Sequence, residues 1–205
     1  RAVLIVCGIL SGCVSPQRDA PTSASEAILE PDESIWQPGP SRIIHLAGGI
    51  ECHLDSREVL IPASIAIDSG WIEQIACLRG TREHESIFVS DCQPSLVHSA
   101  LLLIGLESGV PGRWLETKRG DRYEIERVPP TGAPVRIRVR FTDLDGHVIE
   151  SSVEEMVMGS PDATVFPPTP WMFCGSRFDR EGRYVADYSG SLVGFATFGD
   201  EVLGL

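Results

Sequence analysis

Short runs of alternating or branched apolar residues dominate the chain from residue 42 onward, and they predict a series of β-strands. The clearest run is 135–141, where apolar residues alternate with arginines as in a strand with one buried face. Asp145-Gly146 is a turn signal, so 147–154 is expected to return beside this strand, with Glu150 and Glu154 as cross-strand partners. Further extended runs are expected at 42–46, 50–54, 59–67, 71–78, 86–89, 169–173, 184–188 and 192–198, with 59–67 and 71–78 paired across a turn at 68–70.

One segment has helical periodicity, at about 94–106. Its apolar residues recur three and four positions apart, and Pro94 suits the first position of a helix, where an amide hydrogen is not needed. The segment 107–133 is rich in glycine, proline and charges of both signs, which predicts a long solvated loop. The pattern therefore predicts an α+β fold: a β-rich single domain with one principal helix.

The amino-terminal twelve residues are typical of an export signal. Arg1 precedes an apolar run that is shorter than the roughly 20 residues that span a bilayer. The ending Leu10-Ser11-Gly12-Cys13 resembles the bacterial lipobox, which implies diacylglycerol on the Cys13 thiol, cleavage before Cys13 and acylation of the new amino group. Several acyl chains give stable anchoring. The alternatives are a plain signal peptide or a buried first strand, because the run also has strand propensity.

Three regions are therefore expected along the chain. Residues 1–12 form the lipoprotein signal peptide, and 13–40 form a flexible tether whose polar, proline-containing sequence cannot bury enough apolar surface to fold. Residues 41–205 form the folded domain. This organisation predicts a protein on the extracytoplasmic, periplasmic side of the cell envelope that meets the membrane through the lipid on Cys13.

Composition limits the classes of function. The 205 residues, 42% of them hydrophobic, suffice for one domain with a core. A net charge of −12 repels phosphate backbones, so nucleic acid is excluded as a partner. The sequence contains no P-loop, no dinucleotide fingerprint and no G-x-S-x-G elbow, so we predict no cofactor and favour a role other than catalysis.

Four cysteines remain in the expected domain: Cys52, Cys77, Cys92 and Cys174. An exported domain meets oxidising conditions, so they could form two disulfides in any of three pairings, or they could remain buried thiols. Without a C-x-x-C pair, an iron–sulfur or structural zinc site is disfavoured.

The best candidate site is the stretch Arg82-Glu83-His84-Glu85 with His98 on the expected helix. His84, Glu85 and His98 could bind a transition metal, joined by Cys77 or Cys92, if the helix packs back against the preceding strand. The spacing is not that of an H-E-x-x-H motif, and a structural role at a strand end is the favoured interpretation. The stretch 143–146 has two aspartates but lacks the other ligands of a calcium loop, so a turn explains it.

Several motifs, taken in order, resemble the YdjY family of bacteria, which is frequent among planctomycete lipoproteins. The similar pieces are Cys77 with 82–86, then 94–112, 129–132, 171–176 and 184–190, so that the resemblance spans roughly 42–205. It implies no established chemistry, and the cysteine spacing does not support the ferredoxin-like label of some members. Members of the family continue beyond the region 199–205, so we expect this chain to be cut short there.

These observations lead to two hypotheses about function. The first is a lipid-anchored, non-catalytic binding or accessory module of the cell envelope with an envelope protein as its partner. The alternative is a metal-binding or redox protein that uses His84, Glu85 and His98 with Cys77 or Cys92.

Overall fold

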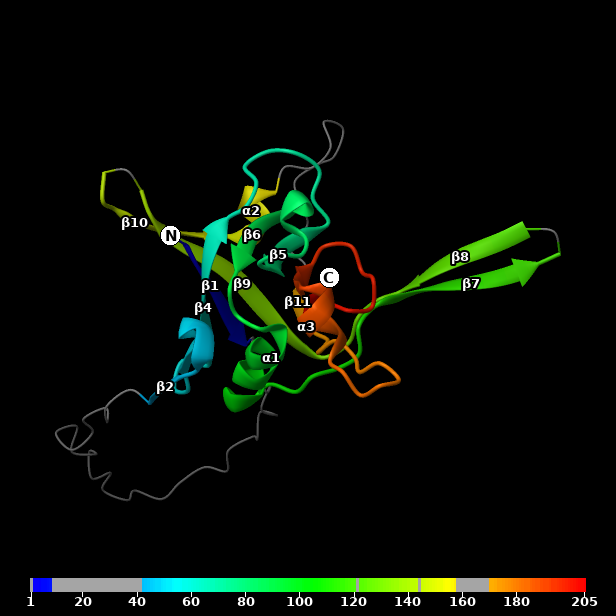
Figure 1. Cartoon of the computed structure of the whole chain (residues 1–205), viewed down its shortest axis with the longest axis horizontal. Helices are drawn as coiled ribbons and strands as arrows, with labels where there is room; N and C mark the ends of the chain where they lie inside the picture. Colours follow the sequence, from blue (N-terminus) through cyan, green and yellow to red (C-terminus); the bar gives the residue numbers. More distant parts are fainter. Residues whose placement is uncertain (1, 9–41, 121, 144, 158–169) are drawn as a thin grey trace, which may run out of the picture.

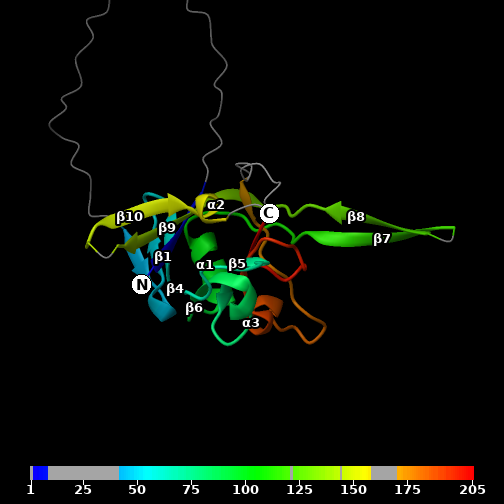
Figure 2. The ribbon, with the colours of Figure 1, turned by 90° about the horizontal axis from the view of Figure 1, so that it is seen from above.

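A computed structural model describes residues 2–8, 42–120, 122–143, 145–157 and 170–205. Within these residues eleven strands form one curled sheet, and two more form a separate hairpin (Figures 1 and 2). Helix α1 (Pro94–Leu103) is the longest described helix, while α2 (Val153–Met156) and α3 (Val185–Ser189) are short. The β-rich class with one principal helix is therefore confirmed for the described residues.

The sheet closes on itself through its first strand. The strands of this sheet are β1 (Ala2–Gly8), β2 (Ile43–His45), β3 (Glu51–His53), β4 (Glu58–Ile65), β5 (Gln74–Leu78), β6 (Ser86–Ser90), β9 (Ala133–Thr142), β10 (Val148–Ser152), β11 (Trp171–Phe173), β12 (Ser191–Gly194) and β13 (Leu203–Gly204). Their order is β1-β9-β11-β13-β12-β5-β6-β4-β3-β2, β10 also pairs with β9, and β1 pairs with β4 to complete a ring. Two short 3-10 helices, η2 (Ala47–Gly49) and η3 (Glu83–Glu85), lie in the connections.

Strand β1 lies between β4 and β9 and runs antiparallel to both. This arrangement corresponds to the first-strand alternative for the amino-terminal run. Residues 9–41 are outside the described part of the chain, so the lipid on Cys13 and the tether over 13–40 stay predictions, as does removal of the signal peptide.

The core fills the inside of the curled sheet. Alternate residues of β4 (Val59, Ile61, Ala63) and of β9 (Val135, Ile137, Val139) are buried, as strand geometry requires. Helix α1 contacts β3, β4, β12 and α3, and it buries Val97, Ala100 and Leu101 at helical spacing.

Gly105, in the left-handed conformation at φ 79°, ends α1 before the expected residue 106, and Arg57 binds the carbonyls at this end. Its guanidinium donates hydrogen bonds from Nε to the Ile104 carbonyl (3.1 Å) and from Nη2 to the Gly105 carbonyl (2.8 Å). These carbonyls lack partners within the helix, and a cation at a helix carboxyl end is also favourable electrostatically.

Three sequence-based expectations were wrong. The segment 107–133 is not a loop throughout, because β7 (Arg113–Arg119) and β8 (Arg122–Val128) form a hairpin. Nearly all of its residues are exposed, so no apolar alternation marks it in the sequence. The segment 184–188 is mostly helical, since α3 occupies it. Strand β5 does not pair with β4. It pairs with β6 and β12, and β6 lies between β5 and the carboxyl end of β4.

Of the two glutamates expected to pair across strands, Glu150 lies on β10 and Glu154 lies in α2. Glu150 forms ion pairs with Arg138 and Arg140 on β9, which confirms the cross-strand prediction. Glu154 instead accepts a hydrogen bond from the Trp171 indole Nε1 at 2.7 Å. Among the described helices, none is both long enough and apolar enough to cross a bilayer.

Gly190, which ends α3, supplies a test of packing between α3 and the 78–85 connection. A Cβ at this position (φ 78°) would lie 2.1 Å from Thr81 Oγ1 and 2.5 Å from Thr81 Cβ. We expect Gly190→Ala to lower the free energy of unfolding by about 2–4 kcal/mol, through left-handed strain and overpacking. Gly182 has the same φ of 78° and no atom within 4 Å, so Gly182→Ala is expected to cost only about 1 kcal/mol. Urea denaturation of both variants compares them, and equal losses would contradict the contact with Thr81.

Candidate functional site

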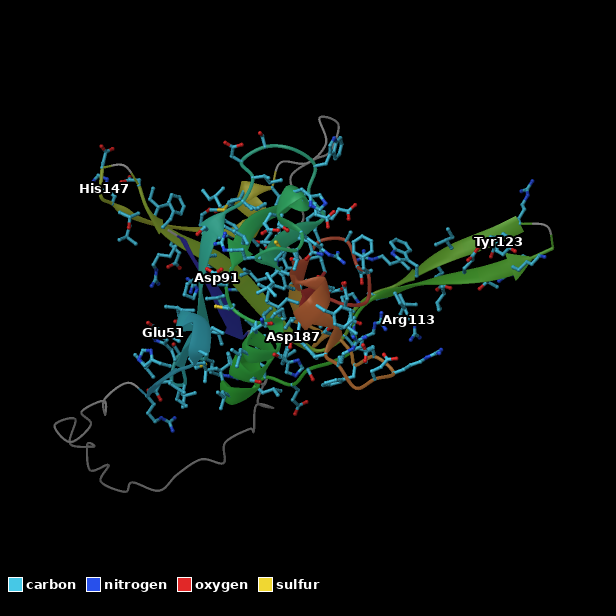
Figure 3. The ribbon with its side chains drawn as sticks, in the orientation of Figure 1. Glu51, Asp91, Arg113, Tyr123, His147 and Asp187 are labelled. Atoms are coloured by element: carbon cyan, nitrogen blue, oxygen red, sulfur yellow. The ribbon has the colours of Figure 1, made fainter. Side chains whose placement is uncertain are left out.

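The β7–β8 hairpin projects from the body of the domain as an arm (Figures 1 and 2). Strand β7 is exposed along its whole length, and β8 is exposed up to its last residue. In the described structure the two strands pair only with each other. Figure 3 shows Tyr123 near the tip of this arm, at the opposite end of the molecule from His147.

One face of the arm concentrates apolar and aromatic residues. The cross-strand register places Trp114 opposite Arg127, Ile125 opposite Glu116, and Tyr123 opposite Lys118, and side chains of directly opposed residues share a face. Trp114, Tyr123 and Ile125 are all exposed on this face. The Lys118 ammonium lies 5.9 Å from the centre of the Tyr123 ring, a cation–π arrangement. We call this set, Trp114, Glu116, Lys118, Tyr123, Ile125 and Arg127, the arm face.

The base of the arm is fastened to the body. The Trp114 indole Nε1 donates to the Thr197 carbonyl at 3.2 Å, and the Arg127 guanidinium donates to the Leu205 carbonyl. Gly112 lies so close to Thr197 that a Cβ would approach its Oγ1 to 2.7 Å. An isolated two-stranded hairpin is only marginally stable in water, so these contacts help to hold the arm in place.

A buried carboxylate shapes the loop that receives the base. Glu201 is fully buried, and its oxygens accept hydrogen bonds from Thr197 Oγ1 (2.6 Å), the Phe198 amide (3.3 Å) and the Asp200 amide (3.1 Å). Several donors are what a buried charge requires if its desolvation is to be offset. Glu201 therefore fixes the turn 197–201 against which Trp114 and Gly112 lie.

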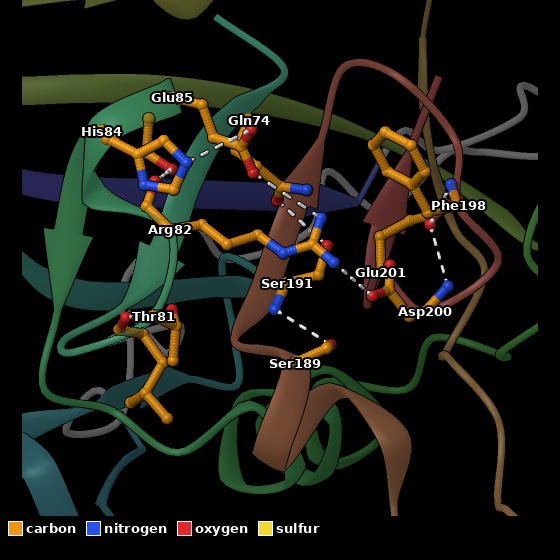
Figure 4. A network of polar contacts seen from close by, with 12 residues as sticks. Gln74, Thr81, Arg82, His84, Glu85, Ser189, Ser191, Phe198, Asp200 and Glu201 are labelled. Atoms are coloured by element: carbon orange, nitrogen blue, oxygen red, sulfur yellow. Dashed lines mark hydrogen bonds and ion pairs between the residues drawn. The ribbon is translucent and has the colours of Figure 1, made fainter.

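An ion-pair cluster joins the same turn to the 82–85 connection (Figure 4). The Arg82 guanidinium lies 2.9 Å from Asp200 Oδ2 and 3.8 Å from Glu85 Oε1, and it stacks 5.3 Å from the centre of the Phe198 ring. Arg82 and Asp200 are mostly buried, with side-chain exposures of 22% and 8%. Because two carboxylates face one guanidinium, the cluster holds two segments of chain together through largely desolvated charges.

Two buried polar atoms next to this cluster lack a protein partner. Ser191 Oγ donates to Gln74 Oε1 at 2.9 Å, while Gln74 Nε2 and Asp200 Oδ1 have no hydrogen-bond partner in the described structure. A buried donor and a buried acceptor of this kind are usually satisfied by ordered water.

A separate apolar depression of about 730 Å³ lies between the ends of β4, β6 and β9, the connection after β4, and α2. Ile65, Ile87, Phe141 and Met156 are among the residues that line it, with Asp68 as its acidic member. A volume of this size is in the range of natural ligand and peptide pockets.

Comparison with known protein families identifies the domain. A family model described as the YdjY domain matches residues 50–202, most of the chain. The chain belongs to the YdjY domain family. No curated protein and no solved structure matches it. The resemblance noted in the sequence is thereby confirmed, and the arm, the ion-pair cluster and the turn 197–201 all lie within the matched YdjY residues.

Of the residues that the sequence suggested as metal ligands, the YdjY domain brings only His84 and Glu85 close together. His84 Nε2 lies 3.8 Å from Glu85 Oε2, and the His84 side chain is 78% exposed. His98 lies instead against Phe173 and Tyr184. Among the described residues, the ligand atoms of three or more such groups converge only at Asp143, Asp145 and His147. There the Asp143 carboxylate accepts from the amides of the other two residues, as in the expected turn.

His98 links α1 to the segment after β11. Its Nδ1 lies 3.2 Å from the Gly175 carbonyl and 2.9 Å from the Tyr184 hydroxyl, and Tyr184 donates to the same carbonyl at 2.9 Å. Since a carbonyl only accepts, Nδ1 carries the proton in this arrangement. Burial lowers the pKa of His98, with the Gly175 hydrogen bond opposing the shift.

The four cysteines of the YdjY domain are free thiols in this structure, and all are buried: Cys52, Cys77, Cys92 and Cys174. The sequence allowed either two disulfides or four buried thiols, and the structure contains buried thiols. Cys174 Sγ donates to the Glu201 and Val202 carbonyls, both at 3.3 Å. Burial, followed by the negative charge of Glu201, raises the pKa of Cys174 to about 12, which makes it a poor nucleophile.

Sequence reasoning missed most residues of the arm and the cluster. Arg82 belongs to a charged stretch that the sequence shows, but its partner Asp200 lies 118 positions away. Gln74, Ser191 and Glu201 are buried polar residues, and no local pattern distinguishes them from exposed ones. Charges of both signs along 113–128 suit a solvated loop and an exposed hairpin equally, so they do not distinguish the two.

Removal of the Arg82 guanidinium is expected to destabilise the domain, because Asp200 would remain buried without its counter-charge. We expect Arg82→Met to lower the free energy of unfolding by about 3 kcal/mol, measured by urea denaturation. Arg79→Met is the control, since Arg79 pairs with Asp91 at 2.6 Å with both side chains at least half exposed. Such surface pairs contribute little to stability, so the control should unfold near the wild-type midpoint. Similar midpoints for the two variants would argue against the cluster.

The lowered pKa of His98 predicts how stability depends on pH. Well above the ordinary pKa of 6.5, the His98 ring is neutral in both the folded and the unfolded chain. The shift in pKa therefore costs no stability in that range. As the pH falls below 6.5, the unfolded chain binds the proton first, so the free energy of unfolding decreases. Titration of the His98 ring protons by NMR should give a midpoint below 6.5, and a midpoint at or above that value refutes the assignment. His98→Gln is expected to lose less stability than the wild type between pH 7 and 5.5.

Proposed function

We propose that this YdjY domain is a lipid-anchored, non-catalytic binding module of the cell envelope, and that the β7–β8 arm is its binding element. The anchor rests on the sequence, on the apolar run followed by Leu10-Ser11-Gly12-Cys13 and the proline-containing tether. Such a tether lets a domain stand away from the membrane surface and reach a partner. The domain then acts on the extracytoplasmic side of the envelope.

The observation that carries the binding role is the exposed arm face. Trp114, Tyr123 and Ile125 hold apolar surface in water on an element that adds nothing to the core. Tryptophan, tyrosine and arginine are the residue types most enriched at the energetic centres of protein interfaces. A contiguous exposed apolar face with charged surroundings is typical of an interaction site.

Charge indicates the kind of partner. Residues 113–128 contain five basic and four acidic residues, a net charge of +1, where the whole chain carries −12. On the arm face, Lys118 and Arg127 accompany the aromatic residues, with Glu116 as the acidic member. The complementary surface is therefore an apolar patch with an acidic rim on a second envelope protein.

The polar groups of the cluster support a role other than catalysis. Arg82 is paired with Asp200 and Glu85, and Glu201 is satisfied by the turn it holds. Such groups fix the base of the arm and position it for binding.

Photo-crosslinking in the cells that make the protein tests this function. A benzoylphenylalanine residue replaces Ile125 on the arm, and in a second strain it replaces Val148 on β10, which is equally exposed (69% and 70%). We expect one discrete crosslinked product at position 125 and none at position 148. Tyr123→Ala added to the first variant should reduce that product about fivefold or more, as loss of an interface anchor does.

Three results would overturn parts of the proposal. Equal crosslinking at positions 125 and 148, or a product that survives Tyr123→Ala unchanged, would remove the arm as the binding element. A native protein whose mass includes an unmodified Cys13 and residues 1–12 would remove the anchor. Stoichiometric zinc, iron or copper that is lost in His84→Ala and in His98→Ala would replace the binding role with the metal-binding alternative.

A further inference from the structure

Strand β1 occupies a space between β4 and β9 that we call the β1 slot. The slot is bounded by residues 58–63 of β4 and 135–141 of β9, and β1 runs antiparallel to both. Neighbouring strands lie about 4.8 Å apart, so β4 and β9 are separated by about twice that distance across the slot. They therefore do not bond to each other, and β1 supplies the hydrogen-bonding partners of both facing edges.

Processing of the leader would empty this slot. Cleavage before Cys13, which belongs to the proposed function, removes the segment that contains β1. The edges of β4 and β9 would then expose unpaired backbone groups over several residues, which a protein seldom leaves without partners.

Buried apolar residues border the slot on both sides. On β4, Val59, Ile61 and Ala63 are at most 6% exposed, and on β9, Val135, Ile137 and Val139 are at most 1% exposed. The register places Leu4 between Ile61 and Val139, and Val6 between Val59 and Ile137. An occupant therefore needs apolar residues at these alternate positions, whereas the positions between them lie level with Leu60, Pro62 and the arginines of β9.

One end of the slot opens into the apolar depression. Ala2 lies opposite Ala63 on one side and Phe141 on the other. The depression is lined by the next residues of both strands, Ser64, Ile65 and Thr142, and by Phe141 itself. An occupant that extends beyond the position of Ala2 at its amino end would reach this depression.

We infer that the processed domain binds an extended peptide segment of another protein in the β1 slot. This rests on leader removal in the proposed function and adds a second binding site, distinct from the arm. The segment has about seven residues, runs antiparallel to β4 and β9, carries apolar residues at alternate positions, and has a further apolar residue at its amino end for the depression. Main-chain hydrogen bonds on both edges supply affinity, and the alternate side chains supply specificity, as in other cases of strand addition.

Hydrogen exchange on the processed lipoprotein in detergent micelles tests the inference. The probe is a synthetic peptide with the sequence of residues 2–8, with Cys7→Ser to prevent oxidation and three lysines added at its carboxyl end for solubility. The matched control peptide carries Ile5→Pro in addition. Because β1 is paired on both edges, every interior amide has a partner, and proline removes one and is not tolerated in a central strand.

Alternate amides of 58–63 and 135–141 face the slot, whereas the amides between them face the strands on the other edge, such as β3, β10 and β11. We expect the slot-facing amides to exchange quickly in the processed protein and about tenfold or more slowly with the probe peptide, while the proline peptide has no effect. Slow exchange of the slot-facing amides without any peptide would overturn the inference and leave the anchor intact, since it would mean that these edges are already paired. Protection that is equal with both peptides would also overturn it. If the native protein retains residues 2–8, β1 is a resident strand, and both the slot and the lipid anchor fail.

Discussion

Backbone hydrogen bonding along β9 joins parts of this domain that are far apart in the sequence. One edge of β9 pairs with β1, and the other pairs with β10 and β11, so the strand connects the first residues of the chain to the carboxyl-terminal quarter. Its alternation of buried Val135, Ile137 and Val139 with arginines fixes which face meets the core. A shift of one residue in register would reverse that alternation, so the rest of the sheet depends on this strand.

The same need for paired edges explains the two features with functional meaning. At the β1 slot, the edges of β4 and β9 are satisfied by a segment whose sequence resembles an export signal. At the arm, β7 and β8 satisfy each other and leave their outer edges to solvent, where charged side chains discourage indiscriminate strand pairing. The slot lies within the sheet and the arm projects from it, and the proposals above assign both of them to recognition of other chains.

Buried charge has a supporting role in this arrangement. Glu201 orders the turn 197–201, and Arg82 binds that turn through Asp200 while it also faces Glu85. The indole of Trp114 then rests on the turn, so the direction of the arm depends on groups that are well inside the domain. In the described structure this polar network is a framework for the arm, whereas His98 and the buried thiols belong to the packing between α1, α3 and the sheet.

Much of the local structure followed from sequence alone, because periodicity reports which face of an element is buried. The pattern of β9, the helical spacing of α1, the turn at Asp145-Gly146 and the YdjY family itself were all evident there. The arm was not, since a hairpin exposed on both faces has no apolar period to detect. Tertiary structure alone decided that Arg82 meets Asp200, that His98 lies apart from His84, and that β1 closes the ring. Strand pairing and ion pairing join residues that are close in space but far apart in sequence, so local spacing along the chain does not reveal them.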